Sequence, residues 1–183
     1  MIDFYPIPFF TGSIVLIAGI SIMKLRGKST VYLLPFSLMG IYLLIVIGLT
    51  LFPIPIPFDG NINFKDQIAS VIYRINLVPF RYLSWFTVRP LLFEILMNIL
   101  LTIPFGFLMN FLSKINWVNF LWISISSGLA IETSQLIMSL FVGPYRTVDI
   151  SDVILNTLGT LLGFLLFKLS RIFFRKMSYS DHR

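Results

Sequence analysis

Seven polar side chains in the second half of the chain have the types and the spacing that binding or catalysis would need. Glu132 and Gln135 lie three residues apart, and the acids Asp149 and Asp152 repeat that spacing after Arg146. Carboxylates accept hydrogen bonds and protons and can bind cations, amides do both kinds of hydrogen bonding, and arginine pairs with anions. The candidate cluster is Asn98, Glu132, Gln135, Arg146, Asp149, Asp152 and Asn156.

Other catalytic residue types are almost missing. The chain has no cysteine, and its one histidine, His182, is the second-last residue. A Ser-His-Asp triad, a thiolate nucleophile and Cys- or His-based metal centres are therefore excluded. We expect no cofactor and no dedicated metal site, so that any chemistry must come from carboxylates, amides, hydroxyls and arginines.

The composition requires these side chains to be positioned by membrane helices. Of 183 residues, 57% are hydrophobic and only 12% are charged, whereas a soluble domain carries roughly 25% charged residues. About 20 apolar residues cross a hydrocarbon core. The charge-free runs predict an all-α, polytopic bundle with transmembrane helices near residues 4–23, 30–52, 91–112, 117–141 and 150–170.

The distribution of Lys and Arg predicts the orientation of the bundle. With the N-terminus outside, the inner segments hold nine of the 14 cations and the outer segments hold five, and cytoplasmic loops collect cations. We therefore expect an N-out/C-in topology, which also accounts for the net charge of +6 without nucleic-acid binding. No cation precedes the first span, so it should be retained rather than cleaved as a signal peptide. The predicted regions are 1–28 (first helix and basic loop), 29–170 (membrane domain) and 171–183 (basic cytoplasmic tail).

Small and polar residues fall on single faces of the last two spans. Spacings of three and four residues keep side chains on one face of an α-helix, and small residues let membrane helices approach closely. We expect these two helices to be antiparallel neighbours, with the candidate cluster in the outer half of the membrane and Arg146 as its counter-ion. The two faces are Ser124, Gly128, Glu132, Gln135 and Ser139, and then Asp149, Asp152, Asn156, Gly159 and Gly163.

Two further segments should shape the site. In the third span, Glu94, Asn98 and Thr102 share a face, and Pro104 with Gly106 predicts a bend. Gly159 and Gly163 are expected to serve helix packing. Residues 53–90 mix cations with aromatic side chains, which is typical of a segment that lies in the headgroup layer. This segment is either a connector or a lid over the candidate cluster.

The order of these elements resembles the VanZ-like family. The resemblance runs from about residue 42 to 168, and only the ordered set of its short motifs is specific. The motifs are Asn76-Leu77-Val78-Pro79-Phe80, Asn98, Pro104-Phe105-Gly106-Phe107, Glu132-x-x-Gln135, and Arg146-x-x-Asp149-x-x-Asp152-x-x-x-Asn156-x-x-Gly159-x-x-x-Gly163.

The resemblance implies a multi-pass protein of the bacterial cell membrane and cell envelope. It also implies a link to low-level resistance to teicoplanin, a glycopeptide antibiotic, and it supplies no reaction. The expected partners are membrane lipids and a lipid-linked cell-wall precursor or lipoglycopeptide; nucleic acid is not expected, and a homo-oligomer is compatible with the sequence.

Several roles for the cluster stay open at this point. The plainest interpretation of Glu132, Arg146, Asp149 and Asp152 is a buried network that fixes how two helices dock. As a function, we favour an outward-facing pocket for a ligand without catalysis. The alternative is an intramembrane carboxylate- or metal-dependent enzyme acting on a lipid or cell-wall intermediate. In that case Asp149 and Asp152 would bind a divalent cation and Glu132 would be the general base. A transporter is less well supported, because the chain has no obvious internal repeat.

Overall fold

Long helices form where the sequence lacks charges. The computed structural model describes residues 7–54, 63–81 and 88–180, and five of its helices are long and apolar enough to cross a membrane. A helix satisfies every backbone polar group within itself, as a hydrocarbon environment demands. The predicted five-span, all-α architecture is confirmed. The five helices are α1 (Ile7–Leu25), α2 (Thr30–Leu51), α4 (Val88–Leu112), α5 (Trp117–Val142) and α6 (Ile150–Ser180).

The last helix is longer than the sequence suggested. We predicted a helix near 150–170 followed by a tail, but α6 continues to Ser180. Residues 171–180 contain no proline or glycine, so the charges that end the apolar run do not end the helix. The predicted start of the first span at residues 4–6, and the end of the tail with His182 and Arg183, lie outside the described residues.

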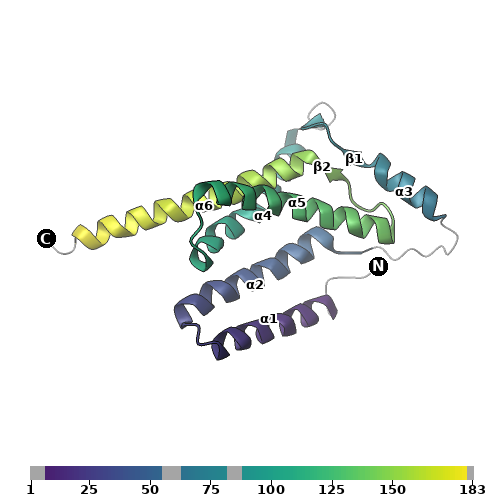
Figure 1. The fold of residues 1–183 in the computed structure, drawn as a ribbon. Helices are drawn as coiled ribbons and strands as arrows, with labels where there is room; N and C mark the ends of the chain where they lie inside the picture. Colours follow the sequence, from purple (N-terminus) through teal and green to yellow (C-terminus); the bar gives the residue numbers. More distant parts are fainter. Residues whose placement is uncertain (1–6, 55–62, 82–87, 181–183) are drawn as a thin grey trace.

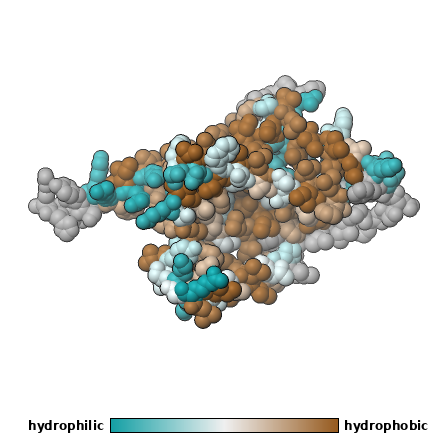
Figure 2. Space-filling model, in the orientation of Figure 1, coloured by the Kyte–Doolittle hydropathy of each residue, from teal (hydrophilic) through white to brown (hydrophobic). Residues whose placement is uncertain are grey.

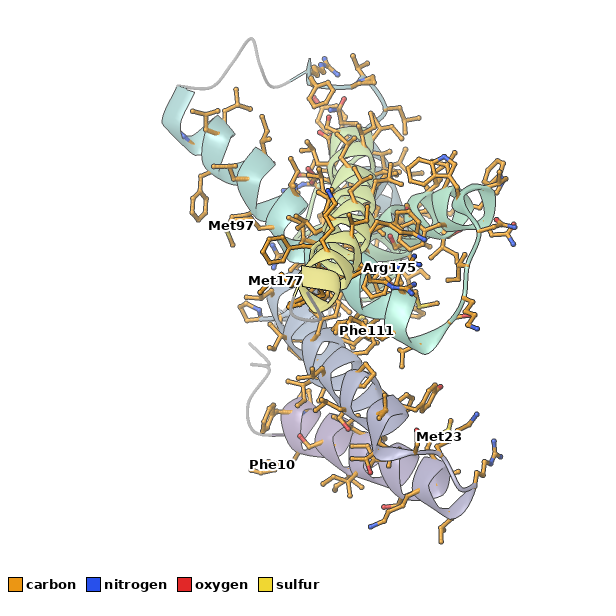
Figure 3. All side chains as sticks on the ribbon, turned by 90° about the vertical axis from the view of Figure 1, so that its left-hand side faces the viewer. Phe10, Met23, Met97, Phe111, Arg175 and Met177 are labelled. Atoms are coloured by element: carbon orange, nitrogen blue, oxygen red, sulfur yellow. The ribbon has the colours of Figure 1, made fainter. Side chains whose placement is uncertain are left out.

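Helix α6 is the centre of the bundle. It packs most extensively on α4 and next on α5. Helix α2 packs on α4 and also on α1, with which it forms a hairpin. Figure 3 shows this arrangement from the end of α6, with α1 and α2 to one side and the labelled Phe10 and Met97 at the outer edge. Exposed apolar side chains such as these suit contact with lipid, because no water-soluble surface is needed there.

Glycines allow α4 and α6 to approach closely. A Cβ added at Gly159 or Gly163 would collide with backbone carbonyls of α4, and one added at Gly106 would collide with the Thr160 carbonyl of α6. The expected packing role of Gly159 and Gly163 agrees with these contacts, and α5 and α6 are neighbours as predicted. Helix α5 does contribute Gly128, whose missing Cβ makes room for the Val153 carbonyl, but Gly159 and Gly163 pack on α4.

A short helix and one strand of a small parallel ladder lie between α2 and α4 in the chain. Helix α3 (Phe64–Tyr73) is followed by β1 (Ile75–Asn76), which pairs with β2 (Val148–Asp149) just before α6. The side-chain amide of Gln67 donates to the Leu140 carbonyl over 2.8 Å and thereby ties α3 to the end of α5. Within the predicted connector, residues 55–62 and 82–87 lie outside the described part of the chain.

The bundle has two chemically different ends. The ladder end holds the ladder, α3, the last turns of α2 and α5 and the first turns of α4 and α6; the basic end holds the α1–α2 and α4–α5 connectors and the second half of α6 (Figure 1). In Figure 2 hydrophobic side chains cover the middle of the visible face and hydrophilic ones gather toward the ends. This banding is the pattern expected of a protein that crosses a bilayer.

Candidate functional site

The ladder places Asp149, just before the start of α6, beside the connector between α2 and α4. Parallel pairing places Asn76 opposite Asp149, and the Asn76 amide Nδ2 donates to Asp149 Oδ2 over 2.7 Å. The other carboxylate oxygen, Oδ1, accepts from the backbone N–H of Ser151 at 2.7 Å and from its hydroxyl at 2.6 Å. Both oxygens of Asp149 are therefore used to join β1 to the start of α6.

Glu132 of α5 contacts the same place, where β1 and the start of α6 meet. Its Oε2 accepts from the backbone N–H of Asp149 over 3.1 Å, and the side chain is only 4% exposed. The Ser151 hydroxyl oxygen also accepts from the backbone N–H of Phe80 over 2.9 Å, where Phe80 adopts a φ of 56°. A left-handed backbone at a non-glycine residue is kept only where its surroundings fix it. This group of residues docks the connector onto α5 and α6.

Asp152 has a different partner, on a different helix. The amide Nδ2 of Asn98 donates to Asp152 Oδ1 over 2.6 Å and joins α4 to α6. One turn deeper, the Thr102 hydroxyl donates to the Asn156 carbonyl over 2.8 Å. Polar side chains inside a bundle normally pair with one another in this way.

Arg146 does not act as the counter-ion that we expected. In the described part of the chain its guanidinium donates to the carbonyls of Leu49 at 3.4 Å and Phe52 at 3.3 Å, and it does not contact a carboxylate. The last carbonyls of a helix have no intrahelical donors and carry the negative end of the helix dipole. The end of α2 therefore attracts the cation that we had assigned to the acids.

Two more donors reach the same end of α2. The Tyr145 hydroxyl donates to the Leu51 carbonyl over 3.2 Å, and Gln135 Nε2 donates to the Thr50 carbonyl over 3.3 Å. Burial raises the pKa of Tyr145, an effect that the neighbouring Arg146 partly offsets, so the hydroxyl keeps its proton for donation. The α5–α6 connector and Gln135 of α5 thus hold the end of α2 against the rest of the bundle.

A cavity of about 470 Å³ opens between these contacts. We call it the polar cavity. Its lining combines two carboxylates, two side-chain amides, a guanidinium and two threonine hydroxyls with apolar side chains. Its lining residues are Leu49, Thr50, Phe93, Glu94, Met97, Asn98, Leu101, Gln135, Arg146, Thr147 and Asp152.

The candidate cluster is therefore split into two groups. Four members line the polar cavity: Asn98, Gln135, Arg146 and Asp152. Glu132 and Asp149 instead form the contact between α5, the start of α6 and the connector that carries β1. Asn156 belongs to neither: it is 1% exposed, and within the described residues its Oδ1 and Nδ2 have no hydrogen-bond partner.

Three important residues were absent from the predicted cluster. Glu94 lines the cavity, and its position four residues before Asn98 was a usable signal, since this spacing puts both on one helix face. Asn76 donates a hydrogen bond to Asp149, and it begins the motif Asn76-Leu77-Val78-Pro79-Phe80 that carried part of the family resemblance. For Ser151, which serves both Asp149 and Phe80, the sequence offered no signal, because its role depends on the ladder.

The acids of the cluster are divided between the polar cavity and the contact with Asn76. Among the described residues, no group of three or more Asp, Glu, His or Cys side chains could hold a metal ion. Protein donors already occupy both oxygens of Asp149. At the polar cavity, Glu94, Asn98 and Asp152 offer hydrogen-bonding groups to a polar ligand.

Comparison with known proteins decides the family. The VanZ/LLP1 family description matches residues 39–173, which includes all the elements of both groups. Protein VanZ of Enterococcus faecium is 30% identical over 141 residues, which cover 73% of this chain and 73% of that protein. The chain belongs to the VanZ/LLP1 family. The resemblance noted from the motifs is confirmed, and no solved structure gives a significant match.

Membership is consistent with the five apolar helices, and both indicate a multi-pass membrane protein. The family match begins at residue 39, within α2, so α1 precedes the matched region. The polar cavity, the ladder and the α4–α6 contact lie inside it.

Proposed function

We propose that this VanZ-family protein binds an amphiphilic envelope ligand at the polar cavity and lowers susceptibility to glycopeptide antibiotics such as teicoplanin. The ligand class is a lipid-linked cell-wall precursor or a lipoglycopeptide, and no reaction on it is required. In the predicted N-out topology, the cavity faces the outer side of the bacterial cell membrane, where such ligands are found.

The observation that carries this proposal is the mixed polar and apolar lining of the cavity. Glu94, Asn98 and Asp152 offer hydrogen-bond acceptors and donors. Among the apolar lining residues, Phe93 is 66% and Met97 is 42% exposed. A site of this kind can accept a polar headgroup or sugar beside an acyl chain, because most small-molecule sites combine an apolar lining with a few polar groups.

The test is the teicoplanin susceptibility of a sensitive Gram-positive host that expresses the protein. Wild type should raise the minimal inhibitory concentration over the empty vector. Glu94→Gln, Asp152→Asn and Met97→Trp should each remove most of that increase, the first two by changing the polar lining and the third by filling the cavity. Membrane abundance is measured in parallel for every variant.

Matched controls lie close to the tested positions. Leu96→Trp adds the same bulk to the next exposed position of α4, outside the cavity lining, and Asp66→Asn removes a carboxylate from the exposed start of α3. Both should behave as wild type. If all three cavity variants also protect the host at wild-type abundance, the cavity does not serve this function; if wild type gives no protection, the glycopeptide role itself is wrong.

A further inference from the structure

Three cations converge at the basic end of the bundle, far from the polar cavity. Lys114 lies in the α4–α5 connector, and Lys168 and Arg171 lie on α6 one turn apart. They share a hollow of about 280 Å³, which we call the basic hollow. Its lining residues are Asn110, Ser113, Lys114, Ile115, Asn116, Phe167, Lys168 and Arg171.

No acid lies close in sequence to these cations on the elements that build the hollow. Residues 95–131, which cover most of α4, the connector and the first half of α5, contain no Asp or Glu, and neither do residues 153–180 of α6. The positive potential of the hollow is therefore not neutralised by the helices that form it.

Aromatic rings hold two of the cations in place. Lys168 Nζ lies 5.0 Å from the ring centroid of Phe164, and Arg171 Cζ lies 6.0 Å from that of Phe167. The Phe167 ring is itself fixed by edge contacts with Phe107 and Phe111, at centroid distances of 5.8 and 4.8 Å. Positioned cations lose less conformational entropy when they bind an anion than freely rotating ones do.

The start of α5 adds to the same potential. Asn116 lines the hollow and caps α5, with its Oδ1 accepting from the Asn119 N–H over 2.8 Å. The positive end of the α5 dipole therefore points to this side, which favours a bound anion.

The hollow lies at the depth of lipid headgroups. From Ile150 to Lys168, α6 rises about 27 Å, close to the roughly 30 Å of a hydrocarbon core. The surrounding Phe111 and Trp117 are each 51% exposed, as expected of side chains at a membrane interface. Lys168 and Arg171 also line a neighbouring hollow with Ile172, Phe174 and Arg175, so that apolar surface continues from the cations. Arg175 is labelled on the near end of α6 in Figure 3.

We propose that the basic hollow binds the phosphate of an anionic phospholipid from the membrane leaflet at the basic end. Lys114, Lys168 and Arg171 contact the phosphate oxygens, the Asn116 cap contributes polar contact, and the acyl chains lie along the exposed apolar side chains of α4 and α6. Basic pockets between transmembrane helices are known to suit lipid phosphates. This site is independent of the polar cavity and of any role in glycopeptide susceptibility.

The test uses the purified full chain in bilayer discs of phosphatidylcholine, with or without phosphatidylglycerol. Phosphatidylglycerol should raise the melting temperature of wild type and stay bound in native mass spectrometry. The triple variant Lys114→Gln, Lys168→Gln, Arg171→Gln should lose this increase and bind the lipid roughly 100-fold more weakly, since each cation near an anionic membrane contributes about 1 kcal/mol.

The matched control removes the same charge from the same end. Lys24, Arg26 and Lys28 lie at the α1–α2 connector, and their triple Gln variant should keep the wild-type response. An equal loss in both triple variants would show that charge alone matters and would overturn the proposal. In pure phosphatidylcholine, the single variant Arg171→Gln should melt at the wild-type temperature. Phosphatidylglycerol must then raise its melting temperature less than that of wild type, which separates binding from folding.

A further arm distinguishes the source of the phosphate. Inorganic phosphate is added to discs of pure phosphatidylcholine, with sulfate as the comparison anion. No stabilisation by inorganic phosphate is expected, because without acyl chains it lacks the apolar contacts. Stabilisation by phosphate that equals the effect of phosphatidylglycerol, and that is lost in the Lys114, Lys168 and Arg171 variant, would overturn the assignment to a lipid.

Discussion

The amide of Asn98 and the carboxylate of Asp152 are hydrogen-bonded over 2.6 Å, across the interface between α4 and α6. The two residues are 54 positions apart, and both line the polar cavity. One contact therefore serves helix packing and shapes the wall of the candidate site. Variants at either residue should change both properties.

A double-mutant cycle on this pair should give a coupling free energy of about 1 kcal/mol, since interhelical hydrogen bonds in membranes average below that value and reach roughly 1.7 kcal/mol. The variants are Asn98→Ala, Asp152→Ala and the double variant, measured by denaturant unfolding in detergent. Asn110→Ala is a suitable control, because Asn110 Nδ2 donates within its own helix to the Gly106 carbonyl. A coupling of zero would show that the bond does not stabilise the interface.

Gly163→Ala should destabilise the protein by about 1–3 kcal/mol, the usual cost of overpacking a tight contact. The added Cβ would collide with the Ile103 carbonyl of α4, and a backbone atom cannot rotate away. Gly19→Ala is the matched control within a membrane span, because its Cβ would meet only the Phe36 ring at 3.7 Å. Unfolding of both variants in the same detergent checks this, and an equal effect would contradict close packing of α4 and α6.

Replacement of Glu132 by leucine should cost about 1–3 kcal/mol, because it leaves the buried N–H of Asp149 without an acceptor. Glu132→Gln should cost less, since its amide oxygen can accept the same bond. Thr133→Val, at the exposed neighbouring position, should have little effect. Thermal unfolding separates the three; if the leucine and glutamine variants are equally stable, the hydrogen bond to Asp149 contributes nothing.

Asn76→Ala should loosen the connector while leaving the membrane helices intact. The variant removes the side-chain donor to Asp149 Oδ2, which supports the pairing of β1 with β2. Hydrogen exchange should therefore accelerate in residues 75–80 and remain unchanged in α4 and α5. Asn119→Ala at the exposed start of α5 is the control. Unchanged exchange in the connector would show that the ladder alone holds it.

Cysteine labelling in intact cells tests the N-out orientation. The chain has no native cysteine, so Leu77→Cys and Thr147→Cys report on the ladder end, while Arg26→Cys and Ser113→Cys report on the basic end. An impermeant thiol reagent should label only the first two. The reverse pattern would place the polar cavity on the cytoplasmic side and remove the outer-surface ligand from the proposed function.

The sequence by itself determined the membrane architecture and the family. Charge-free runs of about 20 residues have the length and composition of membrane spans, and this local property needs no knowledge of neighbouring helices. Helical spacing likewise placed Asn98, Glu132, Asp152 and Asn156 on defined helix faces. The motifs that carry the resemblance are readable along the chain in the same way.

Only the tertiary structure decided which polar groups meet. Asp149 joins Asn76 and Glu132, Asp152 joins Asn98, and Arg146 goes to the carbonyls at the end of α2 rather than to an acid. Gly159 and Gly163 pack on α4 instead of α5. Spacing fixes the face of a helix but not the neighbour of that face, because the neighbour is chosen by the combined packing of all five long helices and by the backbone groups left unpaired at their ends.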